Sequence, residues 1–140
     1  MLGKEGITLK WFRLWFGIGC VGIALLWWLS LIPLQHPSLE GNDKLLHVFA
    51  YALISFWFYC VYQSRYAVGI AVTFIVMGVV IECLQGQTTY RVFSWGDVLA
   101  NFIGVLVAWG LAYFSRATEM LCFLEQQLLK INNREGKGRP

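Results

Sequence analysis

The chain has 140 residues, of which 58% are hydrophobic and 14% charged, with a formal net charge of +3 and a mean hydropathy of +0.59. Soluble domains carry about 25% charged residues, so this composition excludes an ordinary soluble enzyme and is typical of an integral membrane protein. The basic residues form no patterned face, and we expect no nucleic-acid partner.

Four apolar stretches are long enough to cross a membrane, and they occupy residues 11–32, 45–62, 66–84 and 98–114. A helix rises about 1.5 Å per residue, so each stretch crosses a hydrocarbon core of about 30 Å. The sequence therefore predicts an all-α integral membrane protein in which residues 1–114 form one four-transmembrane-helix bundle. The first stretch is too long for the core of a signal peptide and no small-residue cleavage site follows it, so we expect a retained anchor.

The last part of the chain differs from these spans. Apolar residues recur there at helical spacing among charged and amide side chains: Met120, Leu121, Leu124, Leu128 and Ile131. This pattern predicts an amphipathic helix over residues 115–132 that lies on the cytoplasmic membrane surface or pairs with a partner helix. The final residues, 133–140, are polar and basic, and we predict that they are disordered.

Basic residues are distributed unevenly between the two predicted sides of the membrane. All lysines and arginines except Lys44 and Arg91 fall on the side that carries both termini and the turn near Arg65. Because cytoplasmic segments are enriched in basic residues, we predict a multi-pass protein of the inner or plasma membrane with both termini in the cytoplasm. The span ends near Asp43 and Glu82 then face the extracytoplasmic side.

The four cysteines, Cys20, Cys60, Cys83 and Cys122, form no closely spaced pair and are predicted to lie at different depths. We therefore expect small packing residues rather than a disulfide framework or a zinc site. We also expect no cofactor.

Polar residues gather at the predicted extracytoplasmic ends of the last three spans. Asp43, His47 and Tyr51 are spaced four residues apart, so they form one stripe along a helix. Asp43 also stands where that helix begins, and we expect it to act as the N-cap.

Two further motifs bring polar side chains to the same level. Glu82 and Gln85 are three residues apart at the end of the third span, and Asp97 and Asn101 are four apart at the start of the fourth. Small residues repeat every four positions along the fourth span: Ala100, Gly104, Ala108 and Ala112. Such a repeat permits close helix approach in a membrane, so we expect the fourth helix to be packed centrally, with its polar end turned into the bundle.

Two bases complete the candidate binding cluster, which we define as Asp43, Lys44, His47, Tyr51, Glu82, Gln85, Arg91, Asp97 and Asn101. We expect Arg91 to pair with Glu82 or Asp97, and Lys44 to reach one of the same two carboxylates. Such pairs alone would make the cluster a structural latch between helix hairpins. The number of ionisable and amide groups exceeds what a latch needs, and this favours a binding pocket.

His47 is a candidate general acid/base, because an imidazole gains and loses its proton near neutral pH. When charged, it would also suit a phosphate or carboxylate ligand, together with Lys44 and Arg91. Glu82, Asp97 and His47 are of types that bind a divalent metal, but no HExxH-like or repeated acidic motif accompanies them, and we predict no metal site.

The polar motifs DKLLHVFAY (43–51), IECLQ (81–85) and RVFSWGDVLANFIG (91–104) resemble, in the same order, those of the VanZ-like membrane protein family. That family is named for an accessory protein of teicoplanin resistance. The resemblance covers residues 43–113 and implies a small cell-envelope protein; some family members lower susceptibility to lipoglycopeptides. It also implies that all nine cluster residues and Gly104 are family positions. The segment before Arg91 lacks the proline of the family pattern, so we expect a different turn there.

These observations lead to the hypothesis of a binding or modulating protein whose pocket engages a lipid headgroup, a cell-wall precursor or a lipoglycopeptide-type antibiotic. Its partners would be membrane lipids or lipid-linked envelope precursors, and a homodimer or a second membrane protein would supply further helices. One alternative is a membrane enzyme that uses His47 with Glu82 or Asp97 as an acid/base pair on a lipid-linked substrate, although neither Ser94 nor Tyr51 has a clear activating partner. Another alternative is a structural or assembly protein that acts through the C-terminal helix.

Overall fold

The computed structural model describes residues 9–32, 43–89, 91–115 and 117–137, and those residues contain helices and no strand. Four helices are long and apolar enough to cross a membrane: α1 (Phe12–Leu31), α2 (Asp43–Val61), α3 (Ala67–Gln85) and α4 (Trp95–Ser115). A short 3₁₀ turn, η2 (Ser64–Tyr66), joins α2 to α3, and α5 (Ala117–Lys137) follows α4. The predicted all-α architecture of four spans and a C-terminal helix is therefore confirmed.

Two of the spans begin earlier than predicted, and each addition carries an acidic residue. Asp43 is the first residue of α2 and lies inside its first turn, so the prediction that it is the N-cap was wrong. Asp97 likewise lies in the first turn of α4. A carboxylate is stabilised there because the amino end of a helix dipole is positive. Both carboxylates are thus fixed on helices rather than on loops.

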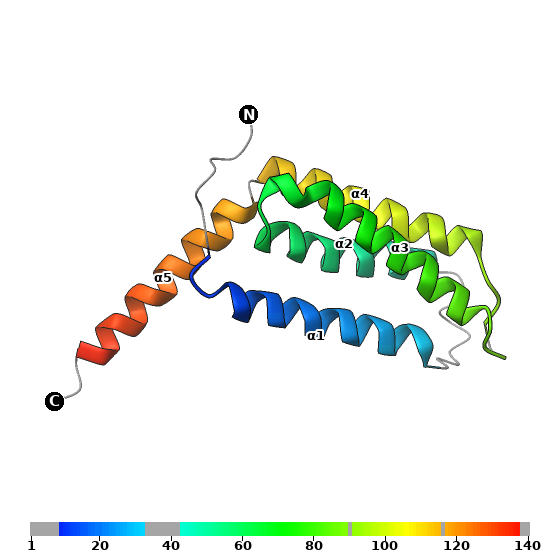
Figure 1. Ribbon diagram of the computed structural model, residues 1–140, viewed down its shortest axis with the longest axis horizontal. Coiled ribbons are helices and arrows are strands. Elements are labelled where there is room, and N and C mark those ends of the chain that lie inside the picture. Colours follow the sequence, from blue (N-terminus) through cyan, green and yellow to red (C-terminus); the bar gives the residue numbers. More distant parts are fainter. Residues whose placement is uncertain (1–8, 33–42, 90, 116, 138–140) are drawn as a thin grey trace.

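The central helix of the bundle is α2, which contacts each of the other helices. Figure 1 shows α1 on one side of α2 and α4 on the other. The fourth helix packs against α2, α3 and α5, and the larger buried side chains belong to α2, such as Tyr51, Phe58 and Tyr59. The ends of α1 and α3 and the beginnings of α2 and α4 meet at one end of the bundle, which we call the polar end.

The backbones of α2 and α4 approach closely at Gly104. A methyl group at this glycine would lie 2.4 Å from the carbonyl oxygen of Val48 and 3.0 Å from the amide nitrogen of Ala52. Ala100 and Ala108 are buried on the same side of α4. The repeat of small residues therefore marks the contact with α2, and it turns the polar end of α4 into the bundle.

Apolar side chains lie both inside the bundle and on its outer surface. Five of the interior residues form one core: Tyr51, Phe58, Ala71, Phe74 and Val105. Many others point outward, and the side chains of Val21 and Phe49 are 61% and 68% exposed. Within the described part of α1, Gly19 is the sole buried residue. An apolar exterior of this extent is suited to contact with lipid chains, and α1 is the helix held least by packing.

The C-terminal helix packs on the end of the bundle opposite the polar end (Figure 1). Leu121 of α5 is buried against Cys60 and Val61 of α2. The hydroxyl of Thr118 donates hydrogen bonds of 3.2 Å and 3.4 Å to the backbone oxygens of Tyr59 and Tyr62. These oxygens belong to the unpaired carbonyl groups at the end of α2, so α5 caps the helix that it packs on.

Glu125 of α5 performs a second capping role at the beginning of α1. This residue is 3% exposed, and its carboxylate accepts hydrogen bonds from the backbone N–H groups of Lys10 (2.8 Å) and Trp11 (2.6 Å). The indole N–H of Trp15 donates a third, of 3.3 Å. A negative charge is favourable at this position, because the amino end of a helix has unpaired N–H groups and a positive dipole.

The predicted C-terminal helix therefore forms, but the face that it packs on the bundle contains the charged Glu125 beside Leu121. Of the five apolar residues in the predicted pattern, Leu121 is buried, and the other four are exposed: Met120, Leu124, Leu128 and Ile131. Its helix also runs beyond the predicted end at residue 132 as far as Lys137, since arginine, glutamate and lysine favour helix. The remainder of the predicted disordered tail, residues 138–140, lies outside the described residues. The position of α5 on a membrane surface stays a prediction.

Candidate functional site

The centre of the candidate site lies between α2 and α4. His47 of α2 is 8% exposed, and its Nδ1 lies 3.0 Å from the amide oxygen of Asn101 on α4. With the amide oxygen in that position, the Nδ1–H group donates the hydrogen bond, and in the neutral imidazole Nε2 then carries the lone pair. Asn101 thereby fixes both the tautomer and the orientation of the imidazole.

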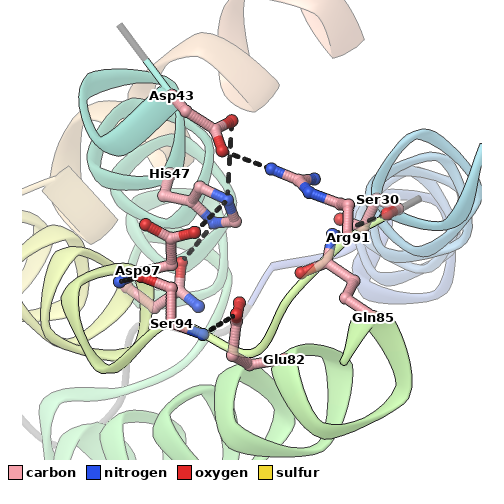
Figure 2. Close-up of polar contacts among 9 residues, drawn as sticks. Ser30, Asp43, His47, Glu82, Gln85, Arg91, Ser94 and Asp97 are labelled. Carbon is pink, nitrogen blue, oxygen red and sulfur yellow. Dashed lines mark hydrogen bonds and ion pairs between the residues drawn. The ribbon is translucent and has the colours of Figure 1, made fainter. Parts of the chain in front are cut away.

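The Nε2 atom of His47 faces two carboxylates, as Figure 2 shows. It lies 3.9 Å from Oδ1 of Asp43, one turn earlier on α2, and 3.9 Å from Oδ2 of Asp97 on α4. The ligand atoms of these three residues are all within 4.8 Å of one another, close enough to share a metal ion. The spacing in the sequence pointed to Glu82 as the third member of such a group, and the structure places Asp43 there.

Arg91 forms an ion pair with Asp43 through its Nη2 atom and the carboxylate Oδ2 (Figure 2). The prediction that Arg91 pairs with Glu82 or Asp97 was therefore wrong. The side chain of Asp43 is 37% exposed, whereas Glu82 and Asp97 are 1% and 7% exposed. Arg91 thus meets the carboxylate that lies nearest the surface.

Lys44 is exposed, and its side chain lies over the first turn of α4. A methyl group added at Gly96 would be 2.7 Å from the Cε atom of Lys44 and 3.7 Å from its Nζ. The predicted contact with Glu82 or Asp97 does not form, and Lys44 makes no ion pair with any residue of the described ranges. A free ammonium group therefore stands at the edge of the cluster.

Glu82 binds the backbone at the start of α4 and forms no ion pair with Lys44 or Arg91 among the described residues. Its Oε1 accepts a hydrogen bond of 2.7 Å from the backbone N–H of Ser94, the residue before α4. The Ser94 hydroxyl accepts one of 3.3 Å from the N–H of Asp97, as an N-cap serine does. In a capping box, the acid at the third helical position binds the N-cap N–H; here Glu82 takes that role, and Asp97 is free to face His47.

Two predicted cluster residues lie away from the centre. Gln85 is 1% exposed, and Figure 2 shows it directed toward Ser30, whose backbone oxygen accepts a hydrogen bond of 2.6 Å from its Nε2. This bond satisfies a carbonyl near the end of α1. Tyr51 is 1% exposed in the core one turn beyond His47, and within the described structure its hydroxyl has no hydrogen-bond partner. Both residues support the helices around the site.

Comparison with protein families places the chain. The model of the VanZ/LLP1 family matches residues 7–116, a range that includes the four long helices and all nine cluster residues. The chain belongs to the VanZ/LLP1 family. The family resemblance of the polar motifs is thereby confirmed, and family membership together with four apolar helices makes this a multi-pass membrane protein of the VanZ-like type.

Among curated proteins, the chain is similar to "Uncharacterized protein C11E3.10" of Schizosaccharomyces pombe (strain 972 / ATCC 24843). The two are 34% identical over 71 residues, which cover 48% of this chain and 44% of the yeast protein. The chain thus spans less than half the length of this relative. No solved structure matches the chain.

Ser94 is a residue of this VanZ-like site that sequence reasoning considered only as a nucleophile. The sequence indicates its role as N-cap, because a serine followed three residues later by an acid, before an apolar run, is typical of a capping box. No sequence pattern indicates the hydrogen bond from its N–H to Glu82, since this bond joins two different helices, α3 and α4.

The site offers acceptors and cations but no activated nucleophile. The Ser94 hydroxyl serves as an N-cap, and the Tyr51 hydroxyl lies in the hydrophobic core. The 3.9 Å between His47 Nε2 and Asp97 Oδ2 is longer than a hydrogen bond, so no proton is shared between them in this arrangement. The geometry therefore favours the binding of an ion or a charged group over nucleophilic catalysis.

Proposed function

We propose that this VanZ-like protein binds the phosphate-bearing headgroup of a membrane lipid at its polar end, on the extracytoplasmic face of the inner or plasma membrane. The observation that carries the proposal is the state of Lys44, which is exposed and has no ion pair within the described residues. Arg91 lies in the same cluster and uses one nitrogen for Asp43, so further N–H donors of its guanidinium are available to a phosphate.

The level of the cluster in the bundle supports a headgroup as ligand. Asp43 and Asp97 stand in the first turns of apolar helices, and Trp95, at the start of α4, is 76% exposed. Tryptophan favours the interface between membrane and water. Lipid phosphates lie at that level, within reach of lysine and arginine side chains.

The basic residues of the cluster favour ligands that carry a phosphate. A phospholipid and a lipid-linked cell-wall precursor both present a phosphate to Lys44 and Arg91, whereas no contact in the described structure favours an antibiotic. A phospholipid headgroup meets the requirement without any further component, because bilayer phospholipids present such phosphates at the level of the cluster.

The proposal is tested by native mass spectrometry of the purified protein. The protein is incubated with equal amounts of phosphatidylglycerol, phosphatidylcholine and diacylglycerol that have identical acyl chains. We expect retention of the two phospholipids and not of diacylglycerol. Lys44→Gln should lower phospholipid retention about tenfold, the effect of losing roughly 1.4 kcal/mol of binding free energy. Because Lys44 is exposed and unpaired, this variant should fold normally.

Lys130→Gln, on the exposed surface of α5, is the matched control for the loss of one lysine charge. It should retain phospholipid as the wild type does. Equal retention of diacylglycerol and phospholipid, or a Lys44→Gln variant that matches the Lys130→Gln control, would contradict the proposal. In a second mixture that also contains a lipid-linked cell-wall precursor, retention of the precursor in preference to both phospholipids would identify the precursor as the ligand instead.

A further inference from the structure

We propose that Asp43, His47 and Asp97 form a binding site for one divalent transition-metal ion, of the zinc or manganese type. The site consists of one imidazole nitrogen and two carboxylate oxygens that converge at the polar end (Figure 2). It goes beyond headgroup binding and does not depend on it, since its ligands are side chains of the protein alone. The sequence predicted no metal site, because these three residues match no metal-binding motif.

The distances in the site are those of side chains that face a common point. Nε2 of His47 is 3.9 Å from an oxygen of Asp43 and 3.9 Å from an oxygen of Asp97, too far for a hydrogen bond to either. Zinc bonds to nitrogen and oxygen ligands are about 2.0–2.2 Å long, so an ion between two such atoms spans up to about 4.4 Å. Tetrahedral coordination would shorten each of the two distances from Nε2 by about 0.5 Å and would bring the two carboxylates closer together, for which the partly exposed Asp43 has room.

Asn101 prepares the imidazole for a metal. Its amide oxygen accepts the hydrogen bond from Nδ1–H, so in the neutral imidazole the lone pair of Nε2 points at the two carboxylates. Histidines that bind metals donate their other ring N–H to an oxygen in the same way, and that bond fixes the tautomer. His47 therefore has the orientation of a ligand before any ion arrives.

The charges around His47 favour a bound cation. Two carboxylates and an imidazole lone pair face one another, and burial of His47 and Asp97 limits screening by water. The guanidinium of Arg91 binds the other oxygen of Asp43, and among the described residues no lysine or arginine is bound to Asp97. Glu82, which is 1% exposed, directs its carboxylate toward the same region in Figure 2, and its Oε2 has no hydrogen-bond partner among the described residues.

The set of ligands indicates the class of ion. Imidazole suits zinc and its neighbours among the transition metals, carboxylates also suit manganese, and magnesium and calcium prefer oxygen ligands alone. Three protein ligands leave at least one coordination position open, as in catalytic zinc sites. The three carboxylates of Asp43, Glu82 and Asp97 outnumber the bases Lys44 and Arg91, so a divalent ion would also reverse the net negative charge of the cluster. An anionic group would then find a positive site.

The first test measures metal binding in lipid-free detergent, so that its outcome is separate from that of the headgroup experiment. Metal-stripped protein is titrated with Zn²⁺, Mn²⁺, Mg²⁺ and Ca²⁺ in separate calorimetric experiments. We expect one Zn²⁺ or Mn²⁺ per chain and weaker binding of Mg²⁺ and Ca²⁺. His47→Gln and Asp97→Asn should each weaken the binding more than tenfold. The controls are His36→Gln, for the other histidine, and Glu119→Gln, a carboxylate on α5; both should bind as the wild type does.

A wild type that binds none of the four ions, or binding that survives in both His47→Gln and Asp97→Asn, would overturn the proposal. If these variants fail to fold, electron spin-echo spectroscopy of Mn²⁺ bound to the wild type decides. We expect modulation from one directly bonded imidazole nitrogen, and it should persist in His36→Gln. Absence of nitrogen modulation in the wild type, or its loss in His36→Gln, would also overturn the proposal.

Asn101 is a positioning residue of the same site. Asn101→Leu removes the acceptor for Nδ1–H and should weaken Zn²⁺ binding about 10–100-fold, the usual effect of losing such a partner. Asn101→Asp retains an oxygen acceptor and should restore most of the affinity. Equal affinities of the leucine and aspartate variants would show that the hydrogen bond does not orient a metal ligand.

Discussion

Glu82 accepts a hydrogen bond of 2.7 Å from the backbone N–H of Ser94, so a buried carboxylate of α3 completes the first turn of α4. In a capping box, Asp97 would accept the hydrogen bond from the N–H of Ser94. Because Glu82 accepts it, the Asp97 carboxylate faces His47 instead. The site on α2 and α4 therefore depends on a residue of a third helix that touches neither His47 nor Asn101 by a hydrogen bond within the described structure.

The first prediction concerns this cap. Glu82→Ala should destabilise the protein by about 1–3 kcal/mol, because the partly buried N–H of Ser94 loses its acceptor. Glu82→Gln should cost less, since its amide oxygen can still accept the bond. Thermal unfolding in detergent measures both effects. Cys83→Ala, at an exposed neighbouring position, should leave the unfolding temperature nearly unchanged; equal melting of all three variants would contradict the capping role.

The second prediction uses two glycines of one helix. Gly104→Ala should lower the free energy of unfolding by about 1–3 kcal/mol, because the added methyl group meets the backbone of α2. Gly110→Ala meets nothing within 4 Å and should be neutral or stabilising by up to about 1 kcal/mol, since alanine favours helix. Denaturant unfolding of the two variants gives the comparison. A Gly104→Ala protein as stable as Gly110→Ala would show that α2 and α4 are farther apart.

The third prediction concerns the attachment of α5. Burial raises the pKa of the Cys122 thiol, and the nearby Glu125 carboxylate raises it further, so this thiol is protonated and reacts slowly with iodoacetamide near neutral pH. Glu125→Ala removes the carboxylate and the three hydrogen bonds to the α1 end. We expect several-fold faster alkylation of Cys122, measured by mass spectrometry of its peptide. Gln126→Ala, at an exposed position beside it, should leave the rate unchanged; an equal rate in both variants would exclude the role of Glu125 in holding α5.

The fourth prediction concerns orientation. The distribution of basic residues predicts that the polar end is extracytoplasmic. In a cysteine-free protein, Thr89→Cys at the exposed polar end should react with a membrane-impermeant maleimide in intact cells. Arg65→Cys, exposed at the opposite end, should react only after the cells are lysed. The reverse pattern would invert the predicted topology.

Much of the site was predictable because helical periodicity decides which side chains share a face. The spacing of four between Asp43 and His47, and again between Asp97 and Asn101, was enough to bring these residues to one end of two helices. Their meeting also required the small side chains near Gly104, which the sequence displays as a repeat every four residues. These features depend on local spacing, which a single sequence records.

The partners of charged residues were not predictable in the same way. Three carboxylates lie at similar levels in the sequence pattern, and Arg91 pairs with Asp43, the one nearest the surface. Helical periodicity does not show how deeply each carboxylate is buried. Glu125 stood among amide residues and resembled a position on a solvated face. Its burial follows from docking on α1, which lies more than a hundred residues away in the sequence.

The bond between Glu125 and Trp11 makes the position of α1 depend on α5. The N–H groups at the amino end of α1 have their acceptor on a helix that lies more than a hundred residues later in the chain. At its other end, α1 is tied by Gln85 of α3, and little packing holds it between these two points. Helices α2, α3 and α4 can therefore assemble while α1 is still loosely held in the bilayer. Docking of α5 then fixes the amino end of α1 against the bundle.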